Sequence, residues 1–510
     1  MPRYAAIDIG SNSIRMLAAE VVSGSPLKTL ASSRQVTRLG EGVFRTGRIG
    51  QSAMELCVNV LAQMAAEYRA VGVIGVRAVG TSALRDASNQ DEFVKRASEA
   101  LQAPVEVISG QEEARLIHLG VQNRWPHPSQ RVLMIDLGGG SAELILSEHG
   151  RMAQAFSKPL GALRLREVFL KSDPPEAREL HRMEEYIQER IVDAVKRFGD
   201  SPYDRAIATS ATAAAVICAV NRVPRAKRET ADRLRATVSQ VRKFYQEVST
   251  GDLESRRRIP GIGPRRAEII VPGVAMLLQV LREFRLPKLY YSSAGLRDGI
   301  IADLAARGVG RELSQLDAEQ RRLMTQMTRR YGVPLPHARK VAALAHTLFD
   351  SLQSLHHLPH SYGKVLEAAS YLHDIGHYIS DTRHHRHSFY MVTNSDMPGF
   401  TERERRLIAI LCRYHRKSTP DATHSQFQAL ESEDKRAVAM LTPLLRLADA
   451  LDRSKDQRVE SLECQTKIGE VILRLRSDAD VDLEQWAGER VADVFREAYG
   501  RQLSITKARR

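Results

Sequence analysis

The sequence predicts an α/β protein in which two similar units face each other across a cleft. The same pattern of strand, glycine-containing loop and strand occurs twice, at residues 4–17 and 132–146. After about residue 303 the strand signal becomes weak, helical patterns take over and histidines become frequent. Because 510 residues are too many for one hydrophobic core, we expect several domains. We place their boundaries at residues 1–124, 125–302, 303–455 and 456–510.

The stretch around which the chain is organised is Val132–Leu146, where two apolar runs flank a glycine-rich loop. A backbone without β-carbons can bring several N–H groups to one phosphate group, so the loop is a candidate phosphate site. Asp136 and Glu143 flank it with carboxylates that could hold a metal ion or orient water. An ordinary hairpin is the alternative. The candidate phosphate-binding residues are Gly138, Gly139, Gly140 and Ser141.

A second copy of this pattern near the start of the chain favours the phosphate interpretation. Asp8 ends an apolar run, small polar residues follow, and a second apolar run begins at Ile14. We expect the two loops to grip one phosphate group from both sides, with Asp8 and Asp136 near the metal ion. The candidate phosphate-binding residues of this copy are Gly10, Ser11, Asn12 and Ser13.

These two loops, together with the stretches Gly80–Arg85 and Ser109–Arg115, resemble the exopolyphosphatase and guanosine pentaphosphate phosphatase (Ppx/GppA) family. The resemblance covers nearly the whole chain and matches the longer members of the family. It implies two actin-like (ribonuclease H-like) lobes around the cleft. An all-α HD-type domain and a small α/β appendage at the C-terminus would follow them. In the appendage, residues 471–475 read as a strand and residues 483–499 as an amphipathic helix.

The resemblance also assigns roles to individual side chains. It implies that Glu113 is the catalytic base, that Glu143 is a second essential carboxylate, and that Arg85 lies in the active cleft and neutralises phosphate. Asp8, Asp136 and Glu143 would hold Mg²⁺, with K⁺ as an activator. Without the resemblance, the position of Glu113 in the first turn of a helix could be explained by the helix dipole alone.

The function implied is metal-dependent hydrolysis of the terminal phosphoanhydride of inorganic polyphosphate, by a homodimer. Two alternatives stay open. One is the removal of the 5′-terminal phosphate of guanosine pentaphosphate (pppGpp) in the same cleft, and the other is a sensor that binds polyphosphate or an alarmone without hydrolysing it. Retention of Glu113 and Glu143 speaks against the sensor, because binding alone does not need both carboxylates.

The charge of the chain favours a long polyanion as partner. The formal net charge is +14, and residues 221–266 hold 13 Lys or Arg against 5 Asp or Glu, a net charge of +8. The arginines at 256–258 and 265–266 could follow a polyphosphate or nucleic-acid backbone. A solvated helical face is the alternative for each of these two clusters.

The cysteines and the apolar stretches indicate a cytoplasmic protein without a membrane segment. The four cysteines are Cys57, Cys218, Cys412 and Cys464, and no two lie at metal-ligand spacing, so we expect reduced thiols. The first predicted strand begins within a few residues of Met1, which leaves no room for a signal peptide. The longest apolar stretch, near residues 213–220, is too short to cross a bilayer.

A second metal site is predicted in the helical region. His337, His373, Asp374 and Asp449 have the order and context of an HD-type metal phosphohydrolase. Adjacent helical residues point about 100° apart, so His373 and Asp374 could bind one divalent ion or bridge two. His387 and His415 could complete a second metal position. The alternative is that these histidines only pack and form hydrogen bonds within the domain.

Overall fold

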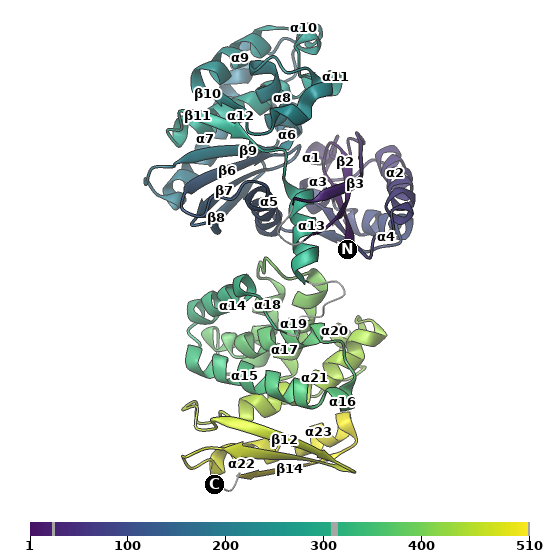
Figure 1. Ribbon diagram of the computed structural model, residues 1–510, viewed down its shortest axis with the longest axis vertical. Helices are drawn as coiled ribbons and strands as arrows, with labels where there is room; N and C mark the ends of the chain where they lie inside the picture. The colour runs from purple at the N-terminus through teal and green to yellow at the C-terminus, as the bar shows by residue number, and fades with distance from the viewer. Residues whose placement is uncertain (23–25, 308–314, 508–510) are drawn as a thin grey trace. The chain divides into compact units, whose positions relative to one another are not determined.

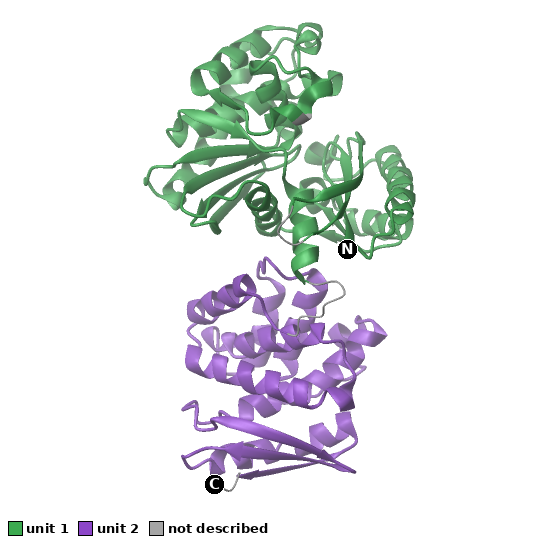
Figure 2. Ribbon diagram, in the orientation of Figure 1, with its two compact units in different colours: residues 1–309 green, residues 310–510 purple. Residues whose placement is uncertain are grey.

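The computed structural model describes residues 1–22, 26–307 and 315–507 (Figure 1). The chain divides into two compact units, residues 1–309 and 310–510 (Figure 2). The expected boundary between residues 302 and 303 falls inside helix α13 (Leu296–Arg307), which belongs to the first unit.

The first lobe of unit 1 is a five-stranded sheet with the order β3-β2-β1-β4-β5. Strands β1, β2 and β3 are antiparallel neighbours. Strand β4 is parallel to β1, and β5 is parallel to β4. Both faces of β1 are buried, because Ala5 and Ile7 pack into one apolar cluster and Tyr4 and Ala6 into another. The elements are β1 (Arg3–Ile9), β2 (Ile14–Glu20), β3 (Lys28–Gln35), α1 (Val43–Thr46), α2 (Gln51–Ala70), β4 (Gly75–Gly80), α3 (Ser82–Asp86), α4 (Gln90–Leu101), β5 (Val105–Val107) and α5 (Gly110–Arg124).

The second lobe repeats this plan in a six-stranded sheet with the order β10-β11-β9-β6-β7-β8. Strands β6, β7 and β8 form an antiparallel meander, and β9 lies parallel to β6 as β4 does to β1. The two mixed α/β lobes agree with the predicted pair of actin-like lobes. The elements are β6 (Arg131–Leu137), β7 (Ala142–Glu148), β8 (Arg151–Lys158), α6 (Ala162–Phe169), α7 (Ala177–Phe198), β9 (Arg205–Thr209), α8 (Ser210–Val220), the 3₁₀ helix η1 (Arg225–Ala231), β10 (Arg235–Thr237), α9 (Val238–Thr250), α10 (Leu253–Arg258), α11 (Pro264–Ala267), α12 (Ile270–Glu283) and β11 (Lys288–Tyr291).

Helices α5 and α13 cross at unusually close range. A β-carbon on Gly299 would lie 1.7 Å from the carbonyl oxygen of Leu116, and one on Gly120 would lie 2.2 Å from that of Gly295. Real β-carbons do not approach backbone atoms this closely. Both positions therefore need glycine, and the crossing holds α5 against the C-terminal helix of the unit.

A closed ring of four buried side chains reinforces this crossing. Arg77 of β4 donates to Glu112 at 3.0 Å and to Asp303 of α13 at 2.8 Å. Arg115 donates to the same two carboxylates at 2.8 and 2.7 Å. Burial alone would raise the pKa of Asp303. The positive charges of Arg307, Arg115 and Arg77 instead hold this pKa below its usual range. The ring ties α5 to both β4 and α13.

Unit 2 combines helices with a three-stranded sheet of order β12-β13-β14. Its helices are α14 (Ala318–Arg330), α15 (Leu335–Ser351), α16 (Gln353–His356), α17 (Ser361–Leu372), the 3₁₀ helix η2 (Ile375–Tyr378), α18 (His384–Thr393), α19 (Glu402–Tyr414), α20 (Ser425–Gln428), α21 (Ser432–Ala450), α22 (Asp482–Glu489) and α23 (Ala492–Tyr499). Its strands are β12 (Ser461–Lys467), β13 (Glu470–Arg476) and β14 (Gln502–Lys507).

The segment 456–510 does not have a core of its own. Leu473 of β13 and Phe495 of α23 belong to the same buried cluster as Leu444 of α21. The single helix expected near residues 483–499 is two helices, which end and restart around Arg490 and Val491. Among the described residues, none of the helices is both long and apolar enough to cross a membrane.

The ring of charges gives a stability prediction. We expect Asp303→Asn to lower the free energy of unfolding of unit 1 by about 3–5 kcal/mol, because it removes one of the two carboxylates that the buried guanidinium groups of Arg77 and Arg115 share. The measurement is urea unfolding followed by the fluorescence of Trp125, in a Trp486→Phe background so that only unit 1 reports.

The matched control removes an exposed ion pair of the same unit. Glu254 accepts from Arg257 at 2.6 Å on the surface, so Glu254→Gln should cost less than about 1 kcal/mol. Equal losses in the two variants would show that the ring does not hold the unit together.

Candidate active site

The two predicted phosphate loops have the same geometry and touch each other. The Gly10 N–H donates to the Ser13 carbonyl at 3.2 Å, and the Gly138 N–H donates to the Ser141 carbonyl at 3.0 Å. A β-carbon on Gly139 would lie 3.2 Å from the β-carbon of Ser11. The loops therefore face each other, as the sequence predicted.

Each loop leaves backbone donors free for an anion. Among the described residues of the two loops, the N–H groups of Ser11, Asn12, Gly139 and Gly140 donate no backbone hydrogen bond. Both loops line one cavity, and Thr81 and Ser82 at the end of β4 line it as well. Several N–H groups converging on one space form a concave site for phosphate oxygens.

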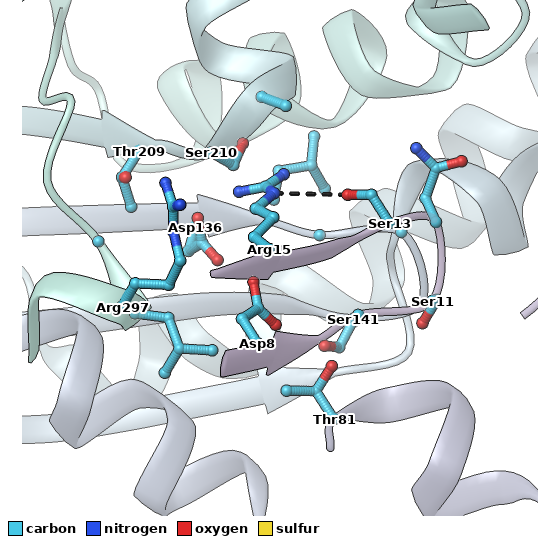
Figure 3. A pocket seen from close by; sticks show the side chains of 18 of the residues that line it. Asp8, Ser11, Ser13, Arg15, Thr81, Asp136, Ser141, Thr209, Ser210 and Arg297 are labelled. Atoms are coloured by element: carbon cyan, nitrogen blue, oxygen red, sulfur yellow. Dashed lines mark hydrogen bonds between the residues drawn. The ribbon is translucent and has the colours of Figure 1, made fainter. Parts of the chain in front are cut away.

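Four carboxylates gather beneath the loops. Asp8 and Asp136 lie at corresponding places, each next to the last residue of its strand, and both line the cavity (Figure 3). In the pairing of β6 with β7, Asp136 lies directly opposite Glu143. Glu113, at the start of α5, lines the same cavity. The cluster thus unites every carboxylate that the sequence analysis assigned to this site.

The first turn of α5 places Glu113. The Ser109 side chain accepts from the Glu112 N–H at 3.2 Å and caps the helix. Glu112 then turns into the buried ring of charges, and Glu113 turns toward the cavity. Arg85 donates to Glu113 at 2.9 Å and to the Ile108 carbonyl at 2.8 Å.

Two of the predicted residues do not line the cavity itself. Arg85 is paired with Glu113 and is not among the residues that line the cavity. Glu143 is fully buried, with one oxygen accepting from Ser157 at 2.9 Å and the other without a hydrogen-bond partner. A buried carboxylate oxygen without a partner suits a cation.

Burial and mutual repulsion raise the pKa values of the carboxylates of this cluster. Burial, together with Glu113, raises the pKa of Asp136 to about 7. Burial raises the pKa of Glu113, although Arg85 opposes it. Burial, Glu113 and Asp136 raise the pKa of Glu143 well above its ordinary value. A divalent cation with oxygen ligands is the group that would offset this concentration of negative charge.

Four arginines also line the cavity, and the sequence analysis singled out only Arg266 among them, although Arg228 lies in the basic span 221–266. Arg15 faces Asp8 across the β1–β2 pair, and Arg297 donates to the Met16 carbonyl at 2.8 Å (Figure 3). Arg228 and Arg266 complete the set. Within the described residues, none of the four forms an ion pair. Burial, together with the positive charges of Arg34, Arg15 and Arg228, lowers the pKa of Arg266. A bound anion would offset these positive charges.

A signal for Arg15 was present in the sequence. It follows Asp8 by the same interval as Glu143 follows Asp136, and the two pairs occupy equivalent register positions. Aligning the two repeats would have drawn attention to it. Arg297 and Arg228 carry no such signal, because only the fold brings residues this distant in sequence together.

A second cavity adjoins the first. The two share Asn12, Ala211, Arg228 and Arg266 as lining residues. The additional arginines of the second cavity are Arg34, Arg225 and Arg265. The basic span 221–266 therefore supplies much of this lining.

The other arginine cluster of that span has a structural role. Arg256 forms an ion pair with Asp173, and Arg257 with Glu254. Of the two clusters considered from the sequence, only the one at 265–266 lines a cavity.

Unit 2 brings together most of the residues predicted for a second metal site. His337, His373, Asp374, His415 and Asp449 converge. His387 is not part of this group, whereas two histidines that we did not predict, His377 and His384, are. His384 is the first residue of α18, and this start of the helix directs it, and not His387, toward Asp374.

Comparison with family models matches two parts of the chain. The Ppx/GppA phosphatase family model matches residues 17–307, and the model for domain III of Ppx/GppA phosphatases matches residues 320–487. The second match concerns the helical region but does not test its HD-type character.

Solved structures give the same result for the two lobes. A Ppx/GppA family member from Aquifex aeolicus is 28% identical, with 60% of this chain and 98% of that chain covered and a TM-score of 0.53. An exopolyphosphatase from Cytophaga hutchinsonii is 25% identical over 60% and 98%, with a TM-score of 0.56. An exopolyphosphatase-like protein is 26% identical over 60% and 98%, with a TM-score of 0.57.

The raised pKa of Asp136 gives a prediction for stability against pH. Its folded pKa of about 7 lies above the unfolded value, so the stability from its protonated form is present at low pH and lost as the pH rises through about 7. In buffer with a chelator, we expect the urea midpoint of unit 1 to fall between about pH 4, near the unfolded pKa of an Asp, and about pH 7, the folded pKa. Asp136→Asn should make this fall smaller, measured by Trp125 fluorescence.

The control is Asp204→Asn, a change at the exposed residue just before β9 that leaves the cluster intact. It should keep the wild-type dependence on pH. An unchanged slope in Asp136→Asn would contradict a raised pKa at this residue.

Proposed function

Since the chain belongs to the Ppx/GppA phosphatase family, we propose that it is an exopolyphosphatase, which hydrolyses the terminal phosphoanhydride of inorganic polyphosphate and releases orthophosphate. The observation that carries the proposal is the combination of charges in the cleft of unit 1. Four carboxylates gather at two phosphate loops, and four arginines without ion-pair partners among the described residues line the same cavity.

This combination of carboxylates, loops and arginines suits hydrolysis of a phosphoanhydride. The free N–H groups of the two loops would bind the oxygens of the terminal phosphate group, and Arg15 and Arg297 would balance its charge. Glu113 would accept a proton from the attacking water, because its raised pKa makes it a better base than an exposed carboxylate. The Arg85 guanidinium would hold this carboxylate in place.

The acidic side of the cleft fits Mg²⁺. Asp8, Asp136 and Glu143 are hard oxygen donors, and the oxygen of Glu143 without a partner needs a cation. These three residues would hold the ion, and Mg²⁺ when bound would supply positive charge beside the phosphoryl oxygens.

Two features favour polyphosphate over pppGpp as substrate. The second cavity continues from the first and adds Arg34, Arg225 and Arg265, so a chain of repeated phosphate units would meet repeated positive charges. One neighbour in structure, the Cytophaga hutchinsonii protein, is itself described as an exopolyphosphatase. We propose a homodimer in the cytoplasm as the form in which the enzyme works.

The role of Glu113 can be measured directly. We expect Glu113→Gln to lower kcat for polyphosphate by about 10²–10⁴-fold, because it removes the proton acceptor but keeps the size of the side chain. Glu99→Gln, at an exposed position on α4 of the same lobe, should stay near wild type. A kcat within twofold of wild type in a folded Glu113→Gln protein would disprove the assignment.

A substrate panel separates the alternatives. Phosphate release is measured with long-chain polyphosphate and with pppGpp, under varied Mg²⁺ and K⁺. We expect a higher kcat/KM for polyphosphate and dependence on Mg²⁺. A higher kcat/KM for pppGpp would favour the nucleotide as substrate, and tight binding of either compound without phosphate release would favour a sensor.

The adjoining cavity gives a sharper version of this test. Arg266→Ala should raise KM for long-chain polyphosphate about 10-fold, since it removes a charged donor that both cavities share. Arg257→Ala, in the same basic span but paired with Glu254, should change KM little. Equal KM values in the two variants would show that the second cavity does not bind the chain.

A further inference from the structure

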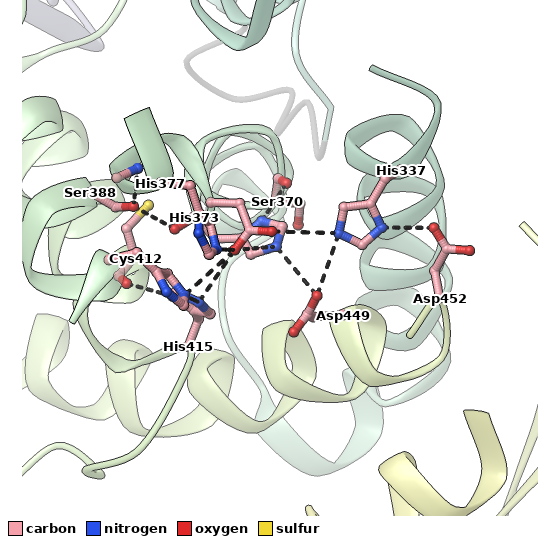
Figure 4. A network of polar contacts seen from close by, with 12 residues as sticks. His337, Ser370, His373, His377, Ser388, Cys412, His415, Asp449 and Asp452 are labelled. Carbon is pink, nitrogen blue, oxygen red and sulfur yellow. Dashed lines mark hydrogen bonds and ion pairs between the residues drawn. The ribbon is translucent and has the colours of Figure 1, made fainter. Parts of the chain in front are cut away.

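A cluster of five histidines and two aspartates in unit 2 takes no part in the chemistry of the cleft. Its members come from six places in the helical region and point toward one another (Figure 4). They are His337 of α15, His373 and Asp374 after α17, His377 of η2, His384 of α18, His415 after α19 and Asp449 of α21.

The first half of the cluster surrounds a space suited to one ion. The Nε2 atoms of His337 and His373 lie 3.5 and 3.4 Å from Oδ1 of Asp449. Both imidazoles are fully buried, and neither Nε2 has a hydrogen-bond partner. Ligand bonds of about 2.1 Å place neighbouring donors about 3.0–3.5 Å apart, so these separations match the edges of a coordination shell.

The second half of the cluster centres on the other side of Asp374. Its Oδ1 lies 3.6 Å from Nε2 of His377, and 3.7 Å from Nε2 of both His384 and His415. The Nε2 atoms of His384 and His415 are 3.2 Å apart. Asp374 also reaches the first half, with Oδ2 3.9 Å from Nε2 of His337. Its two oxygens can therefore serve two ions.

The five imidazoles use their Nδ1 atoms for contacts with residues outside the cluster, so their Nε2 atoms point into it. His337 uses its Nδ1 atom on Asp452 at 2.7 Å and His377 uses its own on Asp381 at 2.6 Å. The Nδ1 atoms of the other three rings lie near backbone carbonyls: Ser370 for His373, Cys412 for His415 and Asp381 for His384. When Nδ1 donates to such an acceptor, Nε2 carries the lone pair, which is how proteins orient histidine ligands of metals.

We propose that unit 2 binds two divalent transition-metal ions, with Asp374 as the bridging carboxylate. His337, His373 and Asp449 hold one ion, and His377, His384 and His415 hold the other. With five imidazoles and two carboxylates, the donor set selects ions such as Mn²⁺, Fe²⁺, Co²⁺ or Zn²⁺ over Mg²⁺ or Ca²⁺. This centre is chemically different from the oxygen-only cluster of unit 1.

The open side of the centre faces solvent. The side chains of His377 and Asp449 are 35% and 22% exposed, whereas those of His337 and His373 are 0% exposed. Lys455 donates to Oδ2 of Asp374 at 3.0 Å from this side, with 42% of its side chain exposed. Ions can enter where these three side chains meet water.

The test is metal analysis of the full chain carrying Asp8→Asn and Asp136→Asn, which removes the acidic cluster of unit 1. The protein is made with a tag free of histidine, incubated with Mn²⁺, Fe²⁺, Co²⁺ or Zn²⁺ and desalted. We expect about two ions per chain for at least one of these metals. Adding Asp374→Asn should remove both ions, and adding His384→Gln should remove about one.

The matched control is His387→Gln, on the same helix as His384 but outside the cluster, which should keep both ions. The visible absorption of bound Co²⁺ gives a second readout, and circular dichroism shows that each variant is folded. The proposal is overturned if none of the four metals stays bound, or if folded Asp374→Asn or His384→Gln retains the metal content of the His387→Gln protein. Since activity is not measured, failure of the proposed function would not affect this result.

Discussion

The ring formed by Arg77, Glu112, Arg115 and Asp303 is the interaction on which the active site depends. Each guanidinium bonds both carboxylates, so the four buried charges compensate one another over contacts of 2.7–3.0 Å. Such a ring adds little net stability over an apolar core, but removal of one member is costly. Its main effect is to fix one arrangement of α5. Glu113 follows Glu112 on that helix, so the fixed helix also sets the direction of the carboxylate that we propose as the proton acceptor.

Carboxylates and arginines line the same cavity, as the binding of a polyanion together with a cation would require. Arg228 and Arg266 also line the second cavity. Alone, either set is unfavourable, as the raised pKa of Asp136 and the lowered pKa of Arg266 show. A cation with a polyanion would relieve both. Binding of both reactants would therefore offset the unfavourable electrostatic free energy of each set of charges.

Local sequence patterns predicted the parts of the site that lie within one loop or helix turn. The two loops, Asp8, Asp136, Glu113 and Glu143 could be found because strand, glycine and cap signals lie next to them. Arg297 could not, since it reaches the cavity only through packing of distant elements, and the net charge of the span 221–266 did not single out Arg228. His387 was chosen over His384 because the pattern of histidines does not reveal where α18 begins, and a shift of three residues changes the direction of the ring.

Extension of α13 to Arg307 and the shared core of unit 2 were missed for a related reason. Domain boundaries were placed where composition changes, but α13 returns to pack on α5, and the C-terminal strands complete the apolar core of the helices. Long-range packing of this kind leaves no mark in a window of neighbouring residues.

The matching register of the two hairpins bears on the ancestry of the lobes. Arg15 and Glu143 are counterparts in a duplicated motif, and they carry opposite charge. With the same residue at both positions, the two halves of the cleft would contact a phosphate group in the same way and could not distinguish the two faces of that group. The opposite charges at this one position give the cleft a polarity, so that, under the proposed function, a linear polymer would enter with its end in one orientation and would be shortened unit by unit from that end.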